Sequence, residues 1–180
     1  MVLALSGPVH RGKTTLLERA LPLWKARGLA CAGFLSPAVT EAGGHVAGYD
    51  LLEIAGGRRH PYLRRQGEAA AERIGPYVFI EETLERARAI VREAGPNELL
   101  VVDEVGPLEL MGRGLWPVLA GVLPKRPGPS LLVVREGLVE ELARRLGPLV
   151  LVVVDIRRPD VLPRLEERVL ERAASDDGQG

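Results

Sequence analysis

A glycine-rich segment near the start of the chain has the residue types and spacing of a phosphate-binding loop. Gly7, Gly12, Lys13 and Thr14 fit the pattern GxxxxGK[ST]. Glycines let the backbone curl so that amide N–H groups point at phosphate oxygens, and the following helix presents its positive end to the same anion. We expect Lys13 to reach the β- and γ-phosphates and the Thr14 hydroxyl to bind Mg²⁺. The sequence therefore predicts the binding of a nucleoside triphosphate with magnesium.

The predicted nucleotide contacts extend over the whole loop and into the helix after it. They are Gly7, Pro8, Val9, His10, Arg11, Gly12, Lys13, Thr14 and Thr15. His10 and Arg11 occupy variable positions of the pattern, and Arg11 could add positive charge near the phosphates.

Two acids follow the strongly apolar segment Leu99–Val102. A phosphate loop needs a second magnesium contact, which we expect from Asp103 at the end of a neighbouring strand. The predicted metal ligands are thus Thr14 and Asp103. Glu104, directly after the metal-linked acid, could polarise a water molecule for in-line attack on the γ-phosphate, or could be a solvated or salt-bridged side chain. Glu109 has apolar neighbours in the sequence, so it could form a structural salt bridge or have a functional role.

Arginine side chains could neutralise charge at the transferred phosphate. Arg135 ends the predicted strand Leu131–Val134 and completes a predicted catalytic set with Glu104 and Lys13. Its alternative role is a salt bridge with a glutamate near the start of the next helix. Arg64 and Arg65 could close over the ligand as a lid, or could simply be solvated.

Another pair of arginines stands near the expected site of the base, after residue 154. Arg157 or Arg158 could stack on a purine there, although a surface role is open for each.

Apolar strands alternate with helices along the chain, which predicts an α/β fold with a mostly parallel sheet covered on both faces, hence three layers. The predicted strands are Val2–Ser6, Leu29–Ser36, Leu99–Val102, Leu131–Val134 and Leu149–Val154. The predicted helices are Thr14–Arg27, Glu81–Ala94, Leu115–Leu123, Glu136–Leu146 and Asp160–Ala173. Pro22 should kink or interrupt the first helix.

Residues 38–65 differ from this pattern, because clustered glycines separate short extended runs. Gly56-Gly57 between Val46–Ile54 and Arg58–Leu63 predicts an antiparallel β-hairpin inserted into the sheet protein. We expect a single domain over residues 1–174 and a disordered tail at 175–180.

Composition narrows the range of partners and compartments. The chain has 24 basic and 24 acidic residues and no long single-sign run, so we expect no nucleic-acid binding. Cys31 is the only cysteine, which precludes an intramolecular disulfide and fits a reducing cytoplasm. No apolar run reaches the roughly 20 residues of a membrane span, so no membrane partner is expected.

Together these segments resemble those of the small P-loop nucleoside-triphosphatases of the thermophilic (THEP) type, which have a human relative called the cancer-related nucleoside-triphosphatase. The resemblance spans nearly the whole chain. It is carried by Gly7–Leu16, by Ala32–Pro37 with Gly48-Tyr49-Asp50, by Gly75–Phe79, and by Val102–Leu110. It implies a RecA-like core and Mg²⁺-dependent hydrolysis of nucleoside triphosphates with broad base specificity. It also implies that Asp103 and Glu104 serve magnesium and water activation.

The chain departs from this family in the hairpin. Members often carry an acidic-Val-Arg stretch and a further arginine, where this chain has Ala38-Val39-Thr40 and His45. Two other functions also remain open: a small-molecule or nucleoside kinase, and a nucleotide-dependent switch or adaptor with slow hydrolysis. Glu104 beside Asp103 favours water as the acceptor.

Overall fold

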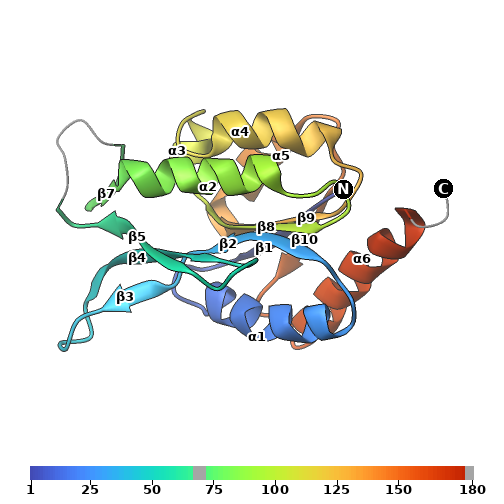
Figure 1. The fold of residues 1–180 in the computed structure, drawn as a ribbon, viewed down its shortest axis with the longest axis horizontal. Coiled ribbons are helices and arrows are strands. Elements are labelled where there is room, and N and C mark those ends of the chain that lie inside the picture. The colour runs from blue at the N-terminus through green and yellow to red at the C-terminus, as the bar shows by residue number, and fades with distance from the viewer. Residues whose placement is uncertain (67–71, 177–180) are drawn as a thin grey trace.

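The computed structural model describes residues 1–66 and 72–176, which form one mixed sheet and the helices that cover it (Figure 1). The strands are β1 (Val2–Gly7), β2 (Cys31–Leu35), β3 (Ala38–Thr40), β4 (Val46–Glu53), β5 (Arg59–Arg64), β6 (Arg73–Ile74), β7 (Tyr77–Phe79), β8 (Leu99–Val105), β9 (Ser130–Arg135) and β10 (Leu151–Asp155). The helices are α1 (Lys13–Ala26), α2 (Glu81–Glu93), α3 (Pro107–Leu110), α4 (Trp116–Val122), α5 (Val139–Leu146) and α6 (Val161–Asp176), with 3₁₀ turns at Leu123–Lys125 and Glu136–Leu138.

The parallel core of the sheet has the order β10-β1-β9-β8-β2. An antiparallel extension then continues the sheet through β4, β5, β7 and β6, while β3 pairs with β4. We call β3, β4, β5, β6 and β7 together the β-insertion. The predicted α/β class with a mostly parallel sheet and an inserted antiparallel hairpin is confirmed.

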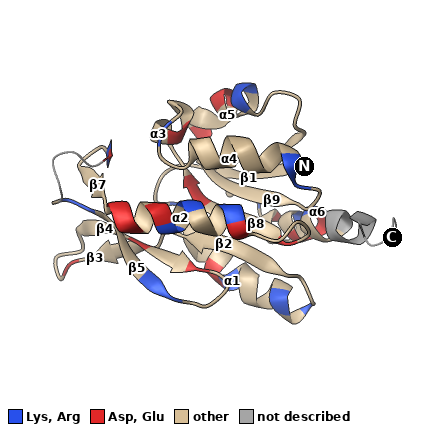
Figure 2. Ribbon diagram, turned by 45° about the horizontal axis from the view of Figure 1, so that its top comes forward, with Lys and Arg blue, Asp and Glu red and all other residues tan. Residues whose placement is uncertain are grey.

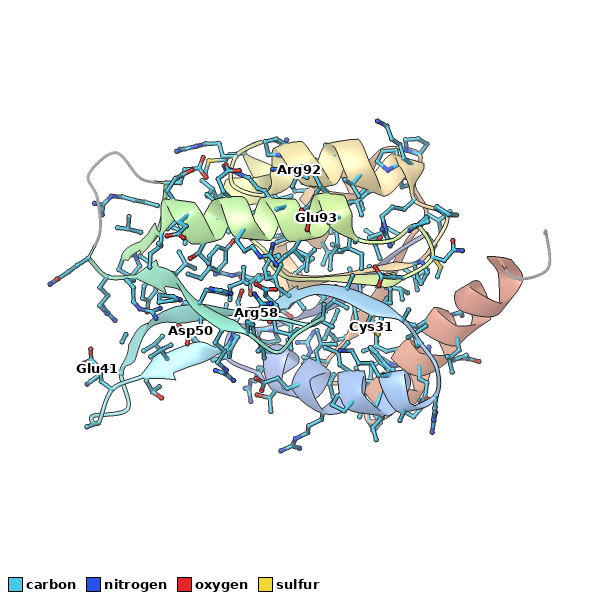
Figure 3. The ribbon with its side chains drawn as sticks, viewed as in Figure 1. Cys31, Glu41, Asp50, Arg58, Arg92 and Glu93 are labelled. Carbon is cyan, nitrogen blue, oxygen red and sulfur yellow. The ribbon has the colours of Figure 1, made fainter. Side chains whose placement is uncertain are left out.

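Two hydrophobic cores lie on opposite faces of the sheet, because successive side chains of a strand point to opposite faces. In β1, Val2 and Ala4 belong to the core beneath α2, α4 and α5, whereas Leu3 and Leu5 belong to the core beneath α1 and α6. Figure 1 shows these two helical layers above and below the sheet. Cys31 is buried on the α1 face, as expected of a strand residue (Figure 3).

Some local predictions were wrong. Of the two effects expected of Pro22, the interruption is absent: Pro22 lies inside α1, where Leu17, Leu21 and Trp24 are buried against the sheet and hold the helix in place. The antiparallel region extends beyond residue 65, because β7 pairs with β5. The predicted tail at 175–180 begins within α6, which ends at Asp176, and residues 177–180 lie outside the described residues.

Both signs of charge are interspersed on the outer helices. Figure 2 shows acidic and basic segments alternating along α2, where the guanidinium of Arg88 lies 2.5 Å from the carboxylate of Glu85. Within the residues that the structure describes, no helix has both the length and the apolar character that a membrane span requires.

Candidate functional site

The carboxyl ends of β1, β9, β8 and β2 meet at one edge of the sheet, which is where open α/β sheets bind their ligands. The loop after β1 curls at this edge and leads into α1. Gly12 has a φ of 80°, a left-handed conformation that glycine adopts without a steric penalty. A Cβ added at Gly7 would lie 2.4 Å from Cγ2 of Ile156, so the loop packs closely on the segment after β10.

Lys13 and Thr14, the first two residues of α1, point in different directions. The Lys13 ammonium is buried and donates hydrogen bonds to the carbonyl oxygens of Gly7 (3.0 Å) and Pro8 (2.8 Å), which places it inside the curve of the loop. The Thr14 hydroxyl donates to Oδ2 of Asp103 at 2.7 Å. The structure thus brings the loop and the first acid of the predicted pair together.

The strand that carries Asp103 is not adjacent to β1, which corrects the prediction of a neighbouring strand. β9 lies between β1 and β8. Since adjacent strands are about 4.8 Å apart, the loop and the first turn of α1 must span the width of β9 to bring Thr14 to Asp103.

Asp103 is a buried carboxylate, with 2% of the residue exposed. Burial raises the pKa of Asp103 to about 6, while the hydrogen bonds from the Thr14 hydroxyl and the Ser36 amide (3.2 Å) oppose this rise. The Ser36 hydroxyl also donates to the backbone oxygen of Asp103. The site therefore holds an oriented carboxylate that a nearby cation would stabilise in its charged form.

These residues fit a magnesium ion. A hydroxyl and a carboxylate are hard oxygen donors, and Mg²⁺ typically takes one or two protein ligands and completes its shell with water and phosphate oxygens. Within the described part of the chain, no group of three or more His, Cys, Asp or Glu side chains could hold a metal ion. Such a cluster is unnecessary for an ion that a bound triphosphate helps to coordinate.

Glu104 lies at a register shift between β8 and β9. Asp103 pairs with Val133 and Val105 pairs with Val134, so Glu104 is an additional residue on β8. An additional residue of this kind bends a strand and re-aims its side chains. This explains how two successive residues of one strand, Asp103 and Glu104, can both line the same cavity.

Arg135 holds the carboxylate of Glu104. Its Nε lies 2.7 Å from Oε1 of Glu104, and both side chains are partly exposed. Of the two roles left open for Arg135, the salt bridge is present, but its partner comes from the adjacent strand β8 rather than from the helix start. The strand of Arg135, β9, pairs directly with β8.

A cavity of about 780 Å³ lies between the phosphate loop and the β-insertion. Its lining includes the loop, Asp103, Glu104 and Arg135. It also includes an aromatic and aliphatic set: Pro37, Ala38, Tyr49, Tyr62, Leu63, Ile74, Pro76, Tyr77 and Phe79. The volume lies within the usual range for small-molecule sites.

Glu109 also lines this cavity and is 2% exposed. Its carboxylate accepts hydrogen bonds from the backbone N–H groups of Gly106 (2.9 Å) and Leu115 (3.4 Å). Burial raises the pKa of Glu109 to about 7, against the lowering effect of these amides. Within the described residues its partners are backbone amides rather than a basic side chain, so Glu109 fixes the segment that follows Glu104.

The structure does not bring the two arginine pairs that we considered into the cavity. Arg64 donates to Asp50 (2.6 Å) and to the backbone oxygen of Tyr49, while Arg65 donates to the backbone oxygen of Val46. Neither lines the cavity, because both are held along β4.

The arginines near the expected base site are likewise held by acids. Arg157 pairs with Asp155 (2.5 Å) and Glu136 (3.1 Å). Arg158 pairs with Asp160 (2.9 Å), and neither arginine lines the cavity.

Sequence reasoning missed several residues of the cavity wall. Arg59 at the start of β5, Tyr49 on β4 and Tyr77 on β7 all line the cavity. Strand alternation could indicate which residues share a face of β4 or β5, but only the way the β-insertion folds towards the loop determines which face lines the cavity.

The sheet order and the loop that joins β1 to α1 define a P-loop fold of the α/β class. A family model described as NTPase matches residues 2–165, and the chain belongs to this family.

Named relatives and solved structures also match most of the chain. The nucleoside-triphosphatase THEP1 of Thermofilum pendens is 31% identical over 165 residues, which are 88% of this chain and 89% of the relative. The human cancer-related nucleoside-triphosphatase is 29% identical over 88% of this chain and 91% of its own length. The solution structure of a human cancer-related nucleoside triphosphatase matches with a TM-score of 0.69 at 26% identity, covering 99% of this chain and 98% of that one. The crystal structure of THEP1 from Aquifex aeolicus has a TM-score of 0.69 at 20% identity, over 94% and 99%, and supports the fold alone.

Proposed function

We propose that the chain hydrolyses nucleoside 5′-triphosphates to the diphosphate and phosphate, with Mg²⁺ as cofactor. One observation carries the proposal: Thr14 and Asp103 are joined at 2.7 Å, and Glu104 lines the same cavity as the phosphate loop. A loop for the phosphates, an oxygen pair for a cation and a carboxylate for a proton are the parts that hydrolysis of a phosphoanhydride requires. The family of the chain and the names of its relatives support the same reaction.

Substrate binding falls to the loop from Gly7 to Thr15. Its amide N–H groups and the N-terminus of α1 face the phosphates, and the buried Lys13 ammonium neutralises the β- and γ-phosphates. Thr14 and Asp103 would hold Mg²⁺, which would supply positive charge against the negative charge that develops on the phosphate oxygens.

Glu104 is the group that we assign to the water molecule. Its carboxylate accepts a proton as the water oxygen bonds to the γ-phosphorus and the bond to the β,γ-bridging oxygen breaks, which releases the diphosphate. Arg135 orients this carboxylate through the contact at 2.7 Å and adds positive charge beside the γ-phosphate.

Broad base specificity is part of the proposal, because the residues that we assign contact the phosphates and the metal and do not contact the base. We also propose that residues 1–174 form a single domain and that the protein is cytoplasmic. The buried Cys31, the only cysteine of the chain, supports a reducing compartment.

The test is phosphate release from ATP, GTP, CTP and UTP in turn, without any acceptor, in Mg²⁺ and again in excess EDTA. We expect release from all four in Mg²⁺, none above background in EDTA, and none from Lys13→Ala in either buffer. Release that survives EDTA would contradict the metal assignment. If the wild type releases no phosphate from any of the four, the hydrolase function is wrong.

The aromatic side of the cavity favours one second candidate, phosphoryl transfer to a small hydroxyl-bearing molecule. The rings of Tyr49 and Tyr77 pack edge-to-face with their centroids 5.4 Å apart, and both line the cavity. They form a wall that suits a ring of the acceptor molecule. Adding adenosine or cytidine to the same assay separates the two functions. Formation of a nucleoside monophosphate would favour the kinase, and unchanged phosphate release favours water as the acceptor.

A further inference from the structure

The β-insertion contributes one arginine to the cavity wall within the described residues. Arg11, Arg59 and Arg135 are the arginines that line the cavity, and only Arg59 belongs to the β-insertion. Arg64 of the same strand is held by Asp50 at 2.6 Å and does not line the cavity.

Arg59 lies beside the first turns of α1. Its Nη2 is 3.8 Å from Oε1 of Glu18. Glu18 follows Thr14 by four residues, so the two side chains share one face of the helix, about 6 Å apart along its axis. Arg59 therefore contacts α1 about one helical turn beyond the residue that we assign to magnesium, and Thr14, Glu18 and Arg59 line the same cavity.

The contact between Arg59 and Glu18 is weak. It is long, and the side chains are 54% and 34% exposed, so solvent screens most of its energy. Arg135 differs, because its Nε is 2.7 Å from Glu104. A guanidinium binds phosphate oxygens through two parallel hydrogen bonds, which is a stronger interaction than a long, screened ion pair. Arg59 can thus exchange Glu18 for a phosphate at little cost.

The direction of the triphosphate follows from the metal residues. Thr14 and Asp103 would hold Mg²⁺ where it neutralises the terminal phosphates, so we place the γ end of the triphosphate on the Asp103 side of the loop. β8 carries Asp103, β2 is its neighbour, and the β-insertion continues the sheet from β2. An arginine on this side is therefore placed to approach the γ-phosphate.

We propose that Arg59 binds the γ-phosphate, so that the chain's own β-insertion supplies the arginine that recognises a triphosphate. Binding of a nucleoside triphosphate then fastens the β-insertion to the first turn of α1, whereas a diphosphate leaves Arg59 with Glu18. This inference rests on the proposed nucleotide site and adds to it the residue that distinguishes triphosphate from diphosphate.

The test compares the affinities of Arg59→Ala for a non-hydrolysable ATP analogue and for ADP, each with Mg²⁺. Loss of a charge-assisted phosphate contact should weaken analogue binding roughly ten- to a hundredfold and leave ADP binding within about twofold. Arg59→Lys keeps the charge and should recover part of the loss. Arg58→Ala is the matched control, because Arg58 (labelled in Figure 3) is exposed and absent from the cavity wall. It should bind both ligands as the wild type does.

A second variant separates phosphate binding from a structural role of the ion pair. Glu18→Gln removes the partner of Arg59 and should retain analogue affinity, whereas a structural role would make Glu18→Gln and Arg59→Ala equivalent. Equal loss of ADP and analogue binding in Arg59→Ala, or no loss of either, would overturn the inference. Because this test measures binding, it does not depend on hydrolysis; failure of the wild type to release phosphate would count against the proposed function instead.

Discussion

Three carboxylates between residues 103 and 109 lie in three environments, and each environment suits a different role. Asp103 is buried beside a hydroxyl, and Glu104 is partly exposed beside a guanidinium. Glu109 is buried and accepts hydrogen bonds from two backbone amides. The first suits a cation, the second a proton from water, and the third holds the chain segment that follows them.

Glu109 leads to a prediction about stability and pH. Its pKa is raised from 4.5 to about 7 in the folded chain, so between these values the unfolded chain loses a proton that the folded chain keeps. Wild-type stability relative to Glu109→Gln should therefore be greatest below pH 4.5 and should fall by roughly 3 kcal/mol up to pH 7, then level off. Urea unfolding of both proteins from pH 4 to 8 measures this difference.

The comparison with Glu109→Gln isolates one carboxylate, because all others titrate alike in the two proteins. A wild-type stability that rises against the variant between pH 4.5 and 7 would show that Glu109 is ionised and stabilised in the folded chain. That result would contradict the burial argument.

The sequence indicated Asp103 and Glu104 as site residues, because two acids after an uninterrupted apolar strand are a local pattern. It left the partner of Arg135 open, since that contact depends on the register between β8 and β9 and on the additional residue at Glu104. Arg59 was missed for the same reason: its neighbour Glu18 is 41 positions away and the contact exists only in the folded chain.

At the level of elements, the close approach of β2 to β8 positions Ser36 against Asp103. Gly33 pairs with Val101, has a φ of 107°, and a Cβ added there would lie 1.9 Å from the backbone oxygen of Val101. Backbone cannot move aside as a flexible side chain can, so this glycine sets the distance between the strand before Ser36 and the strand of Asp103.

Gly33→Ala should therefore destabilise the fold by about 1–3 kcal/mol, as overpacking of a core does. Gly121→Ala is the matched control. Gly121 is an exposed residue of α4 where an added Cβ meets no atom within 4 Å, and alanine there should stabilise by roughly 0.5–1 kcal/mol. Chemical unfolding of the three proteins gives both values. If Gly33→Ala is as stable as the wild type, β2 and β8 can separate without a cost in stability, which would contradict this account.

Long elements were predictable, because their periodic patterns extend over many residues. β3 and β6 have three and two residues, too few for any pattern, and they form only by pairing with β4 and β7. Pro22 does not interrupt α1, since burial of Leu17, Leu21 and Trp24 outweighs the hydrogen bond that proline removes.

At the level of the whole molecule, the order of the strands determines which residues meet. β9 separates β1 from β8, and the β-insertion adds an aromatic wall beyond β2. The sequence predicted parallel strands and an inserted hairpin, but no local pattern specifies strand order. The phosphate loop, the two acids and the β-insertion meet around one cavity only because the sheet is assembled in this order.

The most direct test of the central claim is the rate of phosphate release by Glu104→Gln at saturating nucleoside triphosphate and Mg²⁺. Loss of the carboxylate that accepts the proton from water should lower this rate on the order of 10²- to 10⁴-fold while triphosphate affinity stays close to that of the wild type. A variant that releases phosphate as fast as the wild type would contradict water activation by Glu104 and the mechanism built on it.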